Sequence, residues 1–126
     1  MTSLLGSPLM PVAAGRDGAA RAELRELDGR PVGWFRLEGG KRRGALGPIE
    51  GDTIERLVRS ACDAGAPIVG VLATSGADLT EGVASLHAWG RVARALSGAS
   101  GTVPIVLCVV GPCVSGPSLL LGLADA

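Results

Sequence analysis

The stretch PIVGVLATSGADLTEG at residues 67–82 and the stretch VPIVLCVVGPCVSGP at residues 103–117 decide how this sequence folds. Each begins as a short apolar run of the β type and passes into a turn of small residues, after which a helix can start. We call these turns the first elbow (residues 74–82) and the second elbow (residues 111–117). A strand, a tight turn and a helix in this order leave backbone N–H groups facing a ligand. Two such turns can aim two N–H groups at one oxygen atom, as an oxyanion hole does.

Composition limits the classes of function. The 126 residues support one domain, and 12 basic residues balance 12 acidic ones, so nothing favours a nucleic-acid or membrane partner. Three cysteines argue against a disulfide scaffold and for a reducing compartment, which predicts a cytoplasmic protein. Residues 95–124 carry no charge, but Pro104, Pro112 and Pro117 divide them into pieces too short to cross a bilayer as one helix. No metal site is predicted.

The N-terminal half predicts a lead-in, a hairpin and a helix. Residues 1–17 lack periodicity and predict a flexible lead-in to a domain over residues 18–126. Asp28-Gly29 separates two strand-like runs at 20–27 and 30–37, which indicates a β-hairpin. A helix should begin near Asp52, with Glu55 completing a capping box, and should end at Gly65.

The C-terminal half predicts two further helices. Over residues 81–96, apolar side chains recur at helical spacing and predict a buried stripe of Val83, Leu86, Trp89, Val92, Ala93 and Leu96. A last apolar helix should run from Ser118 to Ala124. The order is hairpin, helix, strand, helix, strand and helix, an α/β pattern with a parallel pair of strands. Because the chain stops as the last helix forms, we expect the domain to be partial.

The two elbows resemble those of the biotin-dependent acyl-CoA carboxyltransferases, the β subunits of acetyl- and propionyl-CoA carboxylases. The matching residues are Ser75-Gly76-Ala77, Glu81-Gly82, and Gly111-Pro112-Cys113 with Gly116, and the likeness covers residues 28–125. The resemblance implies a crotonase-like fold. Two departures stand out: Asp78 occupies the position of the family's arginine, and Ser115-Gly116-Pro117 stands where the family has Gly-Gly-Ala.

The same resemblance implies a chemistry and a set of partners. A short acyl-CoA, such as acetyl- or propionyl-CoA, would bind with its thioester oxygen between the elbows, held by the amide of Gly76 or Ala77 and that of Ser115 or Gly116. Carboxybiotin on a partner protein would supply the carboxyl group, so a biotin carboxyl carrier protein, a biotin carboxylase and a homo-oligomer are implied. Lys41, Arg42 and Arg43 are either contacts for the CoA phosphates or a solvated basic triplet.

Three alternatives remain from the residues alone. Cys113 could be a thiol nucleophile with His87, the single histidine, as its base. A thiol that merely packs the turn, with His87 at the surface, is the other interpretation of both residues. The chain could also be a carboxyltransferase-like subunit that assembles without catalysis, or another crotonase-type acyl-CoA enzyme.

Overall fold

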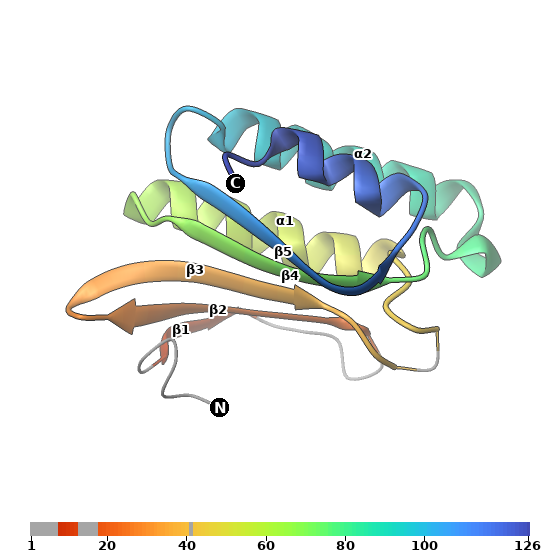
Figure 1. Cartoon of the computed structure of the whole chain (residues 1–126), viewed down its shortest axis with the longest axis horizontal. Coiled ribbons are helices and arrows are strands. Elements are labelled where there is room, and N and C mark those ends of the chain that lie inside the picture. The colour runs from red at the N-terminus through yellow and green to blue at the C-terminus, as the bar shows by residue number, and fades with distance from the viewer. Residues whose placement is uncertain (1–7, 13–17, 41) are drawn as a thin grey trace.

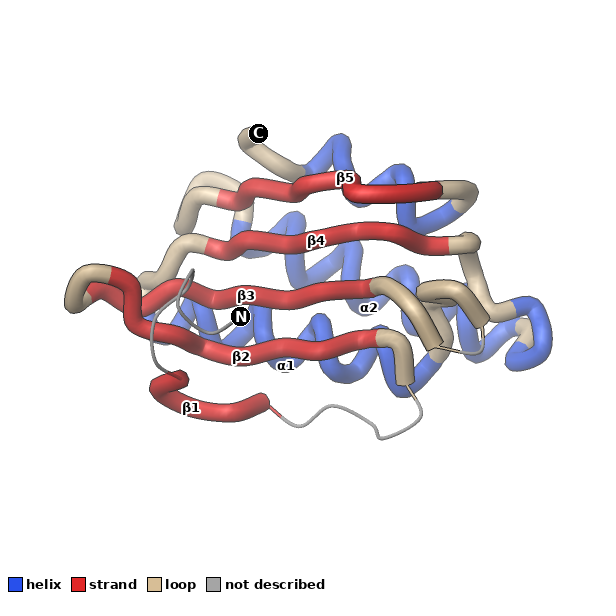
Figure 2. Tube along the Cα trace, turned by 60° about the horizontal axis from the view of Figure 1, so that its bottom comes forward, coloured by secondary structure: helices blue, strands red, loops and turns tan. Residues whose placement is uncertain are grey.

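The fold is a single sheet covered on one face by helices. The computed structural model describes residues 8–12, 18–40 and 42–126. Strand order is β1-β2-β3-β4-β5, and both long helices lie on the same side of the sheet (Figures 1 and 2). The elements are β1 (Pro8–Val12), β2 (Ala20–Leu27), β3 (Arg30–Leu37), α1 (Pro48–Ala64), β4 (Ile68–Thr74), the 3-10 helix η2 (Leu79–Glu81), α2 (Val83–Ala99), β5 (Ile105–Cys113) and the 3-10 helix η3 (Gly116–Leu123).

The N-terminal strands form an antiparallel unit. β2 and β3 pair from Ala20 opposite Leu37 to Leu27 opposite Arg30, and the turn residues Asp28 and Gly29 both have positive φ, as a tight hairpin requires. The predicted hairpin is therefore confirmed. β1 pairs with β2 inside the segment that we predicted as a flexible lead-in. The other residues of that segment lie outside the described ranges.

Helix α1 begins four residues earlier than the sequence suggested. It starts at Pro48, and Gly47 precedes it as N-cap. Glu50 completes the capping box, because its Oε1 accepts the Gly47 N–H (3.1 Å). The prediction that Asp52 and Glu55 cap the helix is wrong; these carboxylates pair with arginines on the helix surfaces. Gly65 ends the helix in the left-handed conformation, as expected.

The apolar stripe predicted for α2 is confirmed at Val92 and Leu96, which are buried, and at Trp89 and Ala93, which pack against the core, but not at its N-terminal end. The buried positions of α2 are Ser85, Ala88, Val92, Leu96 and Ala99. Val83 and Leu86 are 80% and 66% exposed, so placing them in the core was wrong. The reason is close helix packing: a Cβ built on Gly51 of α1 would lie 2.7 Å from the Ala88 Cβ. Small residues face α1 because only they permit this approach.

Strands β3, β4 and β5 run parallel, and their order positions the site. Gly33 pairs with Ile68, and Ile68 pairs with Ile105. The segments that follow these strands therefore emerge at one edge of the sheet. They are the glycine-rich loop (residues 38–47), the first elbow and the second elbow. Within the described ranges, no helix is long and apolar enough to cross a membrane.

Candidate active site at the carboxyl edge of the parallel strands

The glycine-rich loop and the first elbow form a short ladder. Leu46 N–H donates to Gly76 C=O (2.8 Å), and Asp78 N–H donates to Leu46 C=O (3.0 Å). Because C=O and N–H point in opposite directions across a trans peptide, the Ala77 N–H points away from the loop. β4 lies between β3 and β5, so the side away from the loop is the side of the second elbow.

The two amides that directly precede Ala77 in the first elbow are occupied. Ser75 N–H donates to Arg43 C=O (2.9 Å), and Gly76 N–H donates to the Thr74 hydroxyl (3.1 Å). Of the two amides considered at this elbow, the Gly76 amide is therefore bonded internally. The Ala77 amide donates to no group among the described residues. Thr74, which is fully buried, was not marked by any sequence pattern.

The second elbow turns later than the sequence indicated. Gly111, Pro112 and Cys113 belong to β5, so the strand does not end at Val110 as expected. The turn is made by Val114 and Ser115, and a 3-10 helix follows from Gly116 where we predicted a helix from Ser118. Gly111 continues the strand against β4: a Cβ built on it would lie 3.1 Å from the Ala73 Cβ.

The two elbows meet directly. A Cβ built on Gly76 would lie 3.2 Å from the Ser115 Cβ and 3.4 Å from the Val114 oxygen. Since the Val114 C=O lies beside Gly76, the N–H of Ser115, trans to it, points away from the first elbow. Ser115 C=O accepts Ser118 N–H (3.1 Å) and the Ser118 hydroxyl (2.5 Å), so the Gly116 N–H points away from η3. We call these two amides the outward amides: that of Ala77, which points away from the glycine-rich loop, and that of Gly116, which points away from η3.

Ser115 is held in a conformation that normally belongs to glycine. Its φ is 61° and its ψ is −140°, a region that is strained for any residue with a Cβ. The resemblance described above places glycine at this position. The serine therefore adds strain to the site.

Replacing Ser115 with glycine should stabilise the protein. We expect Ser115→Gly to raise the free energy of unfolding by roughly 1–2 kcal/mol, because the strain is released. Ser115→Ala keeps the Cβ and should give no comparable gain. Urea unfolding of both variants checks this, and equal stabilities of the two variants would contradict the strain.

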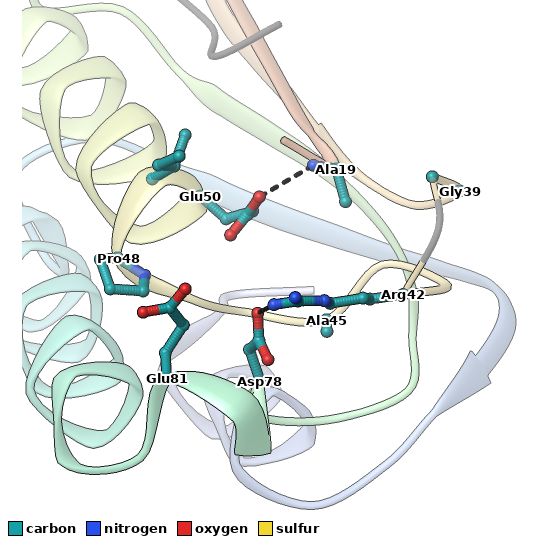
Figure 3. Close-up of a pocket in the computed structure, with 10 residues that line it drawn as sticks. Ala19, Gly39, Arg42, Ala45, Pro48, Glu50, Asp78 and Glu81 are labelled. Carbon is teal, nitrogen blue, oxygen red and sulfur yellow. Dashed lines mark hydrogen bonds and ion pairs between the residues drawn. The ribbon is translucent and has the colours of Figure 1, made fainter. Parts of the chain in front are cut away.

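The negative charge of Asp78 is paired within the protein. Its side chain is 8% exposed and forms an ion pair with Arg42 of the glycine-rich loop (Figure 3). Asp78 also caps η2, because its Oδ1 accepts the Thr80 N–H (3.0 Å) and hydroxyl (2.6 Å). The hydroxyl hydrogen bond from Thr80 and the ion pair with Arg42 lower the pKa of Asp78, and burial opposes them. The carboxylate therefore ties the loop to the first elbow.

Two pockets lie beside the ion pair between Arg42 and Asp78. One, of about 380 Å³, is lined by Arg42, Glu50, Asp78 and Glu81 (Figure 3). Glu50 is committed to the fold there, because its Oε2 accepts the Ala19 N–H (3.0 Å). The other pocket, of about 440 Å³, joins the loop to both elbows and is lined by Gly39, Gly40, Arg43, Ala73, Ser75, Pro112 and Val114.

The two described residues of the basic triplet line different pockets. Arg42 is engaged by Asp78, whereas Arg43 lines the pocket between the elbows and has no ion pair among the described residues. Lys41 lies outside the described residues. Arg43 is therefore the described cation of the triplet that is available to an anionic ligand.

Cys113 lacks the surroundings of a nucleophile. Burial raises the pKa of its thiol, whereas a reactive cysteine needs a lowered pKa. His87 is exposed on α2, and no hydrogen bond joins it to Cys113 among the described residues. The thiol that packs the turn is the better interpretation.

Comparison with known proteins shows the family of this chain. The carboxyl transferase domain family matches residues 24–126. The chain belongs to this family. The carboxyltransferase subunit of propionyl-CoA carboxylase from Haloferax mediterranei is 35% identical over 100 residues, which is 79% of this chain and 19% of that protein. The alpha subunit of methylmalonyl-CoA decarboxylase from Veillonella parvula is 33% identical over 99 residues, again 79% of this chain and 19% of that protein.

Solved carboxyltransferases share the fold. A transcarboxylase 12S hexamer with methylmalonyl-CoA bound superposes with a TM-score of 0.78 at 25% identity, covering 85% of this chain and 21% of that one. A Pseudomonas malonate decarboxylase in complex with malonate gives 0.78 at 26% identity, over 85% of this chain and 41% of that one. The predicted crotonase-like α/β fold is thus confirmed. The chain spans about a fifth of the length of the curated relatives named above.

Proposed function

We propose that this chain forms the acyl-CoA half of a carboxyltransferase site. The observation that carries the proposal is the meeting of the elbows at Gly76 and Ser115, with the outward amides of Ala77 and Gly116. The thioester oxygen of a short acyl-CoA, such as propionyl- or acetyl-CoA, accepts hydrogen bonds from these two amides. The pocket beside them receives the rest of the ligand, and Arg43 contacts a CoA phosphate.

Backbone amides suit the chemistry of this family. When the α-carbon of a thioester loses its proton, negative charge develops on the thioester oxygen. Fixed N–H donors bind that charge more tightly than the neutral carbonyl, so they favour the transition state over the substrate. Removing one such donor typically costs on the order of a hundredfold or more in rate. We assign no side chain of this chain to proton removal.

The partners follow from the family and are likewise proposed. Carboxybiotin, carried on a biotin carboxyl carrier protein and loaded by a biotin carboxylase, would supply the carboxyl group, and we assign none of the described residues to holding it. Relatives in Mycobacterium tuberculosis are named biotin-dependent acetyl-/propionyl-CoA carboxylase beta5 subunits. A homo-oligomer is supported by the hexamer of the transcarboxylase. The free cysteines at 62, 108 and 113 support a reducing, cytoplasmic location.

The test is whether the acyl group reaches the elbows. We expect propionyl-CoA to bind in calorimetry and to shift the amide resonances of Ala77 and Gly116 in ¹H–¹⁵N spectra. CoA without an acyl group should bind but leave these two resonances nearly unchanged. Absence of propionyl-CoA binding would overturn the proposal and favour the alternative of a subunit that assembles without catalysis.

Arg43 should be the basic residue that matters for CoA. We expect Arg43→Gln to weaken CoA binding roughly tenfold, because a charge-assisted hydrogen bond contributes about 1.5–3 kcal/mol. Arg30→Gln removes the same charge from the exposed hairpin at the other end of β3 and should leave the affinity unchanged. If calorimetry shows that Arg43→Gln and Arg30→Gln lose the same CoA affinity, the effect comes from the overall charge and not from a contact of Arg43.

A further inference from the structure

Trp89 links the two elbows, although the sequence marked it only as a core residue. It lies in α2, which starts directly after the first elbow. Its indole Nε1–H donates to the C=O of Gly116 in the second elbow (2.7 Å). The indole is half-buried. This bond is therefore a direct connection between the helix that leaves one elbow and the turn that forms the other.

The ring also explains why residue 116 is glycine. A Cβ built on Gly116 would lie 3.3 Å from Trp89 Cδ1 and 3.5 Å from its Nε1. Gly116 is not among the glycines with positive φ, so backbone conformation does not require glycine here. The close approach of the indole favours glycine instead, because a Cβ here would push the ring by a few tenths of an ångström. The indole ring of Trp89 thus lies next to the place that a side chain on residue 116 would occupy.

The consequence concerns the direction of the Gly116 amide. The C=O of Ser115 is held by Ser118 (N–H 3.1 Å, hydroxyl 2.5 Å), and the C=O of Gly116 is held by Trp89. Both peptide planes around Gly116 are thus fixed through their carbonyls. Ser118 holds the peptide that carries the Gly116 N–H, and Trp89 holds the following peptide, between Gly116 and Pro117. Trp89 therefore limits the direction of the Gly116 N–H indirectly, because it fixes the backbone on the other side of the Gly116 Cα.

We propose that Trp89 is a positioning residue that aims the Gly116 amide at the space beside Ala77. The effect of Trp89 on acyl-group binding rests on the proposed function. The hydrogen bond from Trp89 to the Gly116 C=O does not depend on it. Trp89 acts through the backbone and touches no reacting atom. An elbow without this hold would still be a turn, but its amide would sample other directions, and a preorganised donor would be lost.

The test uses Trp89→Phe, which keeps an aromatic ring and removes the N–H donor. In the free protein we expect the amide resonances of Gly116 and Ser118 to shift and the ¹⁵N order parameter of Gly116 to fall. Affinity for propionyl-CoA should drop roughly three- to tenfold, as expected for one hydrogen bond. Affinity for CoA without an acyl group should not change. A purely structural role would lower both affinities together.

The matched control is Trp34→Phe, which removes an indole on the sheet, between Arg25 and Arg36, with no bond to either elbow. It should leave the Gly116 resonance in place. If Trp89→Phe fails to fold, Gly116→Ala probes the same contact from the other side, because its Cβ would lie 3.3 Å from Trp89 Cδ1 and press on the ring. An unchanged Gly116 order parameter in a folded variant overturns the positioning role. Absent propionyl-CoA binding in the wild type overturns only the proposed function.

Discussion

Gly44→Ala is expected to lower the free energy of unfolding by about 3 kcal/mol or more, a loss at the upper end for single substitutions. A Cβ on Gly44 would lie 2.2 Å from the Ala73 C=O and 3.1 Å from the Cα atoms of Glu38 and Thr74. All three neighbours are backbone atoms of the loop and of β4, so no flexible side chain can move aside. The φ of Gly44 is also positive (76°), which adds strain for alanine.

Gly39→Ala is the matched control for this substitution. Gly39 lies in the same loop with a positive φ of 72°, but a Cβ there would meet nothing within 4 Å. Gly39→Ala should therefore cost only about 1 kcal/mol, from the conformation alone. Urea unfolding of both variants separates the collision from the strain. Equal losses would show that the loop does not lie against β4 as described.

The effect of Gly44→Ala should extend to the site. Displacing the loop breaks the ladder between Leu46 and residues 76 and 78, because both of its hydrogen bonds depend on the loop position. The amide resonances of Ser75 and Asp78 should therefore shift, since both N–H groups donate to loop carbonyls. If Gly44→Ala is destabilised but these resonances do not shift, the substitution affects the stability of the fold and not the site.

Local signals predicted the elements whose chemistry is local. Asp28-Gly29 predicted the hairpin, because both positions must adopt positive φ. Gly65 predicted the end of α1 for the same reason. The start of α1 was missed because Asp52 and Glu55 form an equally good capping pattern in sequence. What distinguishes the capping box at Gly47 and Glu50 is a tertiary contact, because the N–H of Ala19 donates to Glu50.

The sequence predicted the two turns of the site, but it did not predict which backbone N–H groups are free to donate. Small residues after two apolar runs indicated two elbows, and parallel strand order brought them together. Which amide remains free was not predictable, because it depends on Leu46, Thr74 and Ser118, which occupy the competing groups. The Leu46 bond is a tertiary contact across 30 residues, whereas those of Thr74 and Ser118 are local side-chain bonds that only the folded turn reveals. Periodicity carries no information on them.

Asp78→Ala should lower the free energy of unfolding by about 2–3 kcal/mol, the combined scale of a helix cap and a buried charge-assisted hydrogen bond. The substitution leaves the Thr80 N–H without its acceptor and Arg42 without its carboxylate. Asp63→Ala removes an exposed carboxylate from α1 and should change stability by less than about 0.5 kcal/mol. Urea unfolding at pH 7 compares the two.

The pH dependence gives an independent measurement of the same group. The pKa of Asp78 is lower in the folded protein than its ordinary value of about 3.9. The ionised carboxylate therefore stabilises the fold fully above about pH 5, and this contribution disappears as pH falls through the lowered pKa. Asp78→Asn cannot ionise, so the stability difference between wild type and Asp78→Asn should be constant above about pH 5 and shrink below pH 4. A difference that stays constant in acid would show an unperturbed carboxyl group.

Substitutions at its two partners then identify which of them holds the Asp78 carboxylate. Arg42 is half-exposed, whereas the Thr80 hydroxyl bond is the largest cause of the lowered pKa. Thr80→Ala should therefore raise the Asp78 pKa more than Arg42→Gln does. If Arg42→Gln has the larger effect, the ion pair is the dominant tie between loop and elbow. The exchange of charges, Arg42→Asp with Asp78→Arg, should then recover more stability than Asp78→Arg alone, because it restores opposite charges across the same gap.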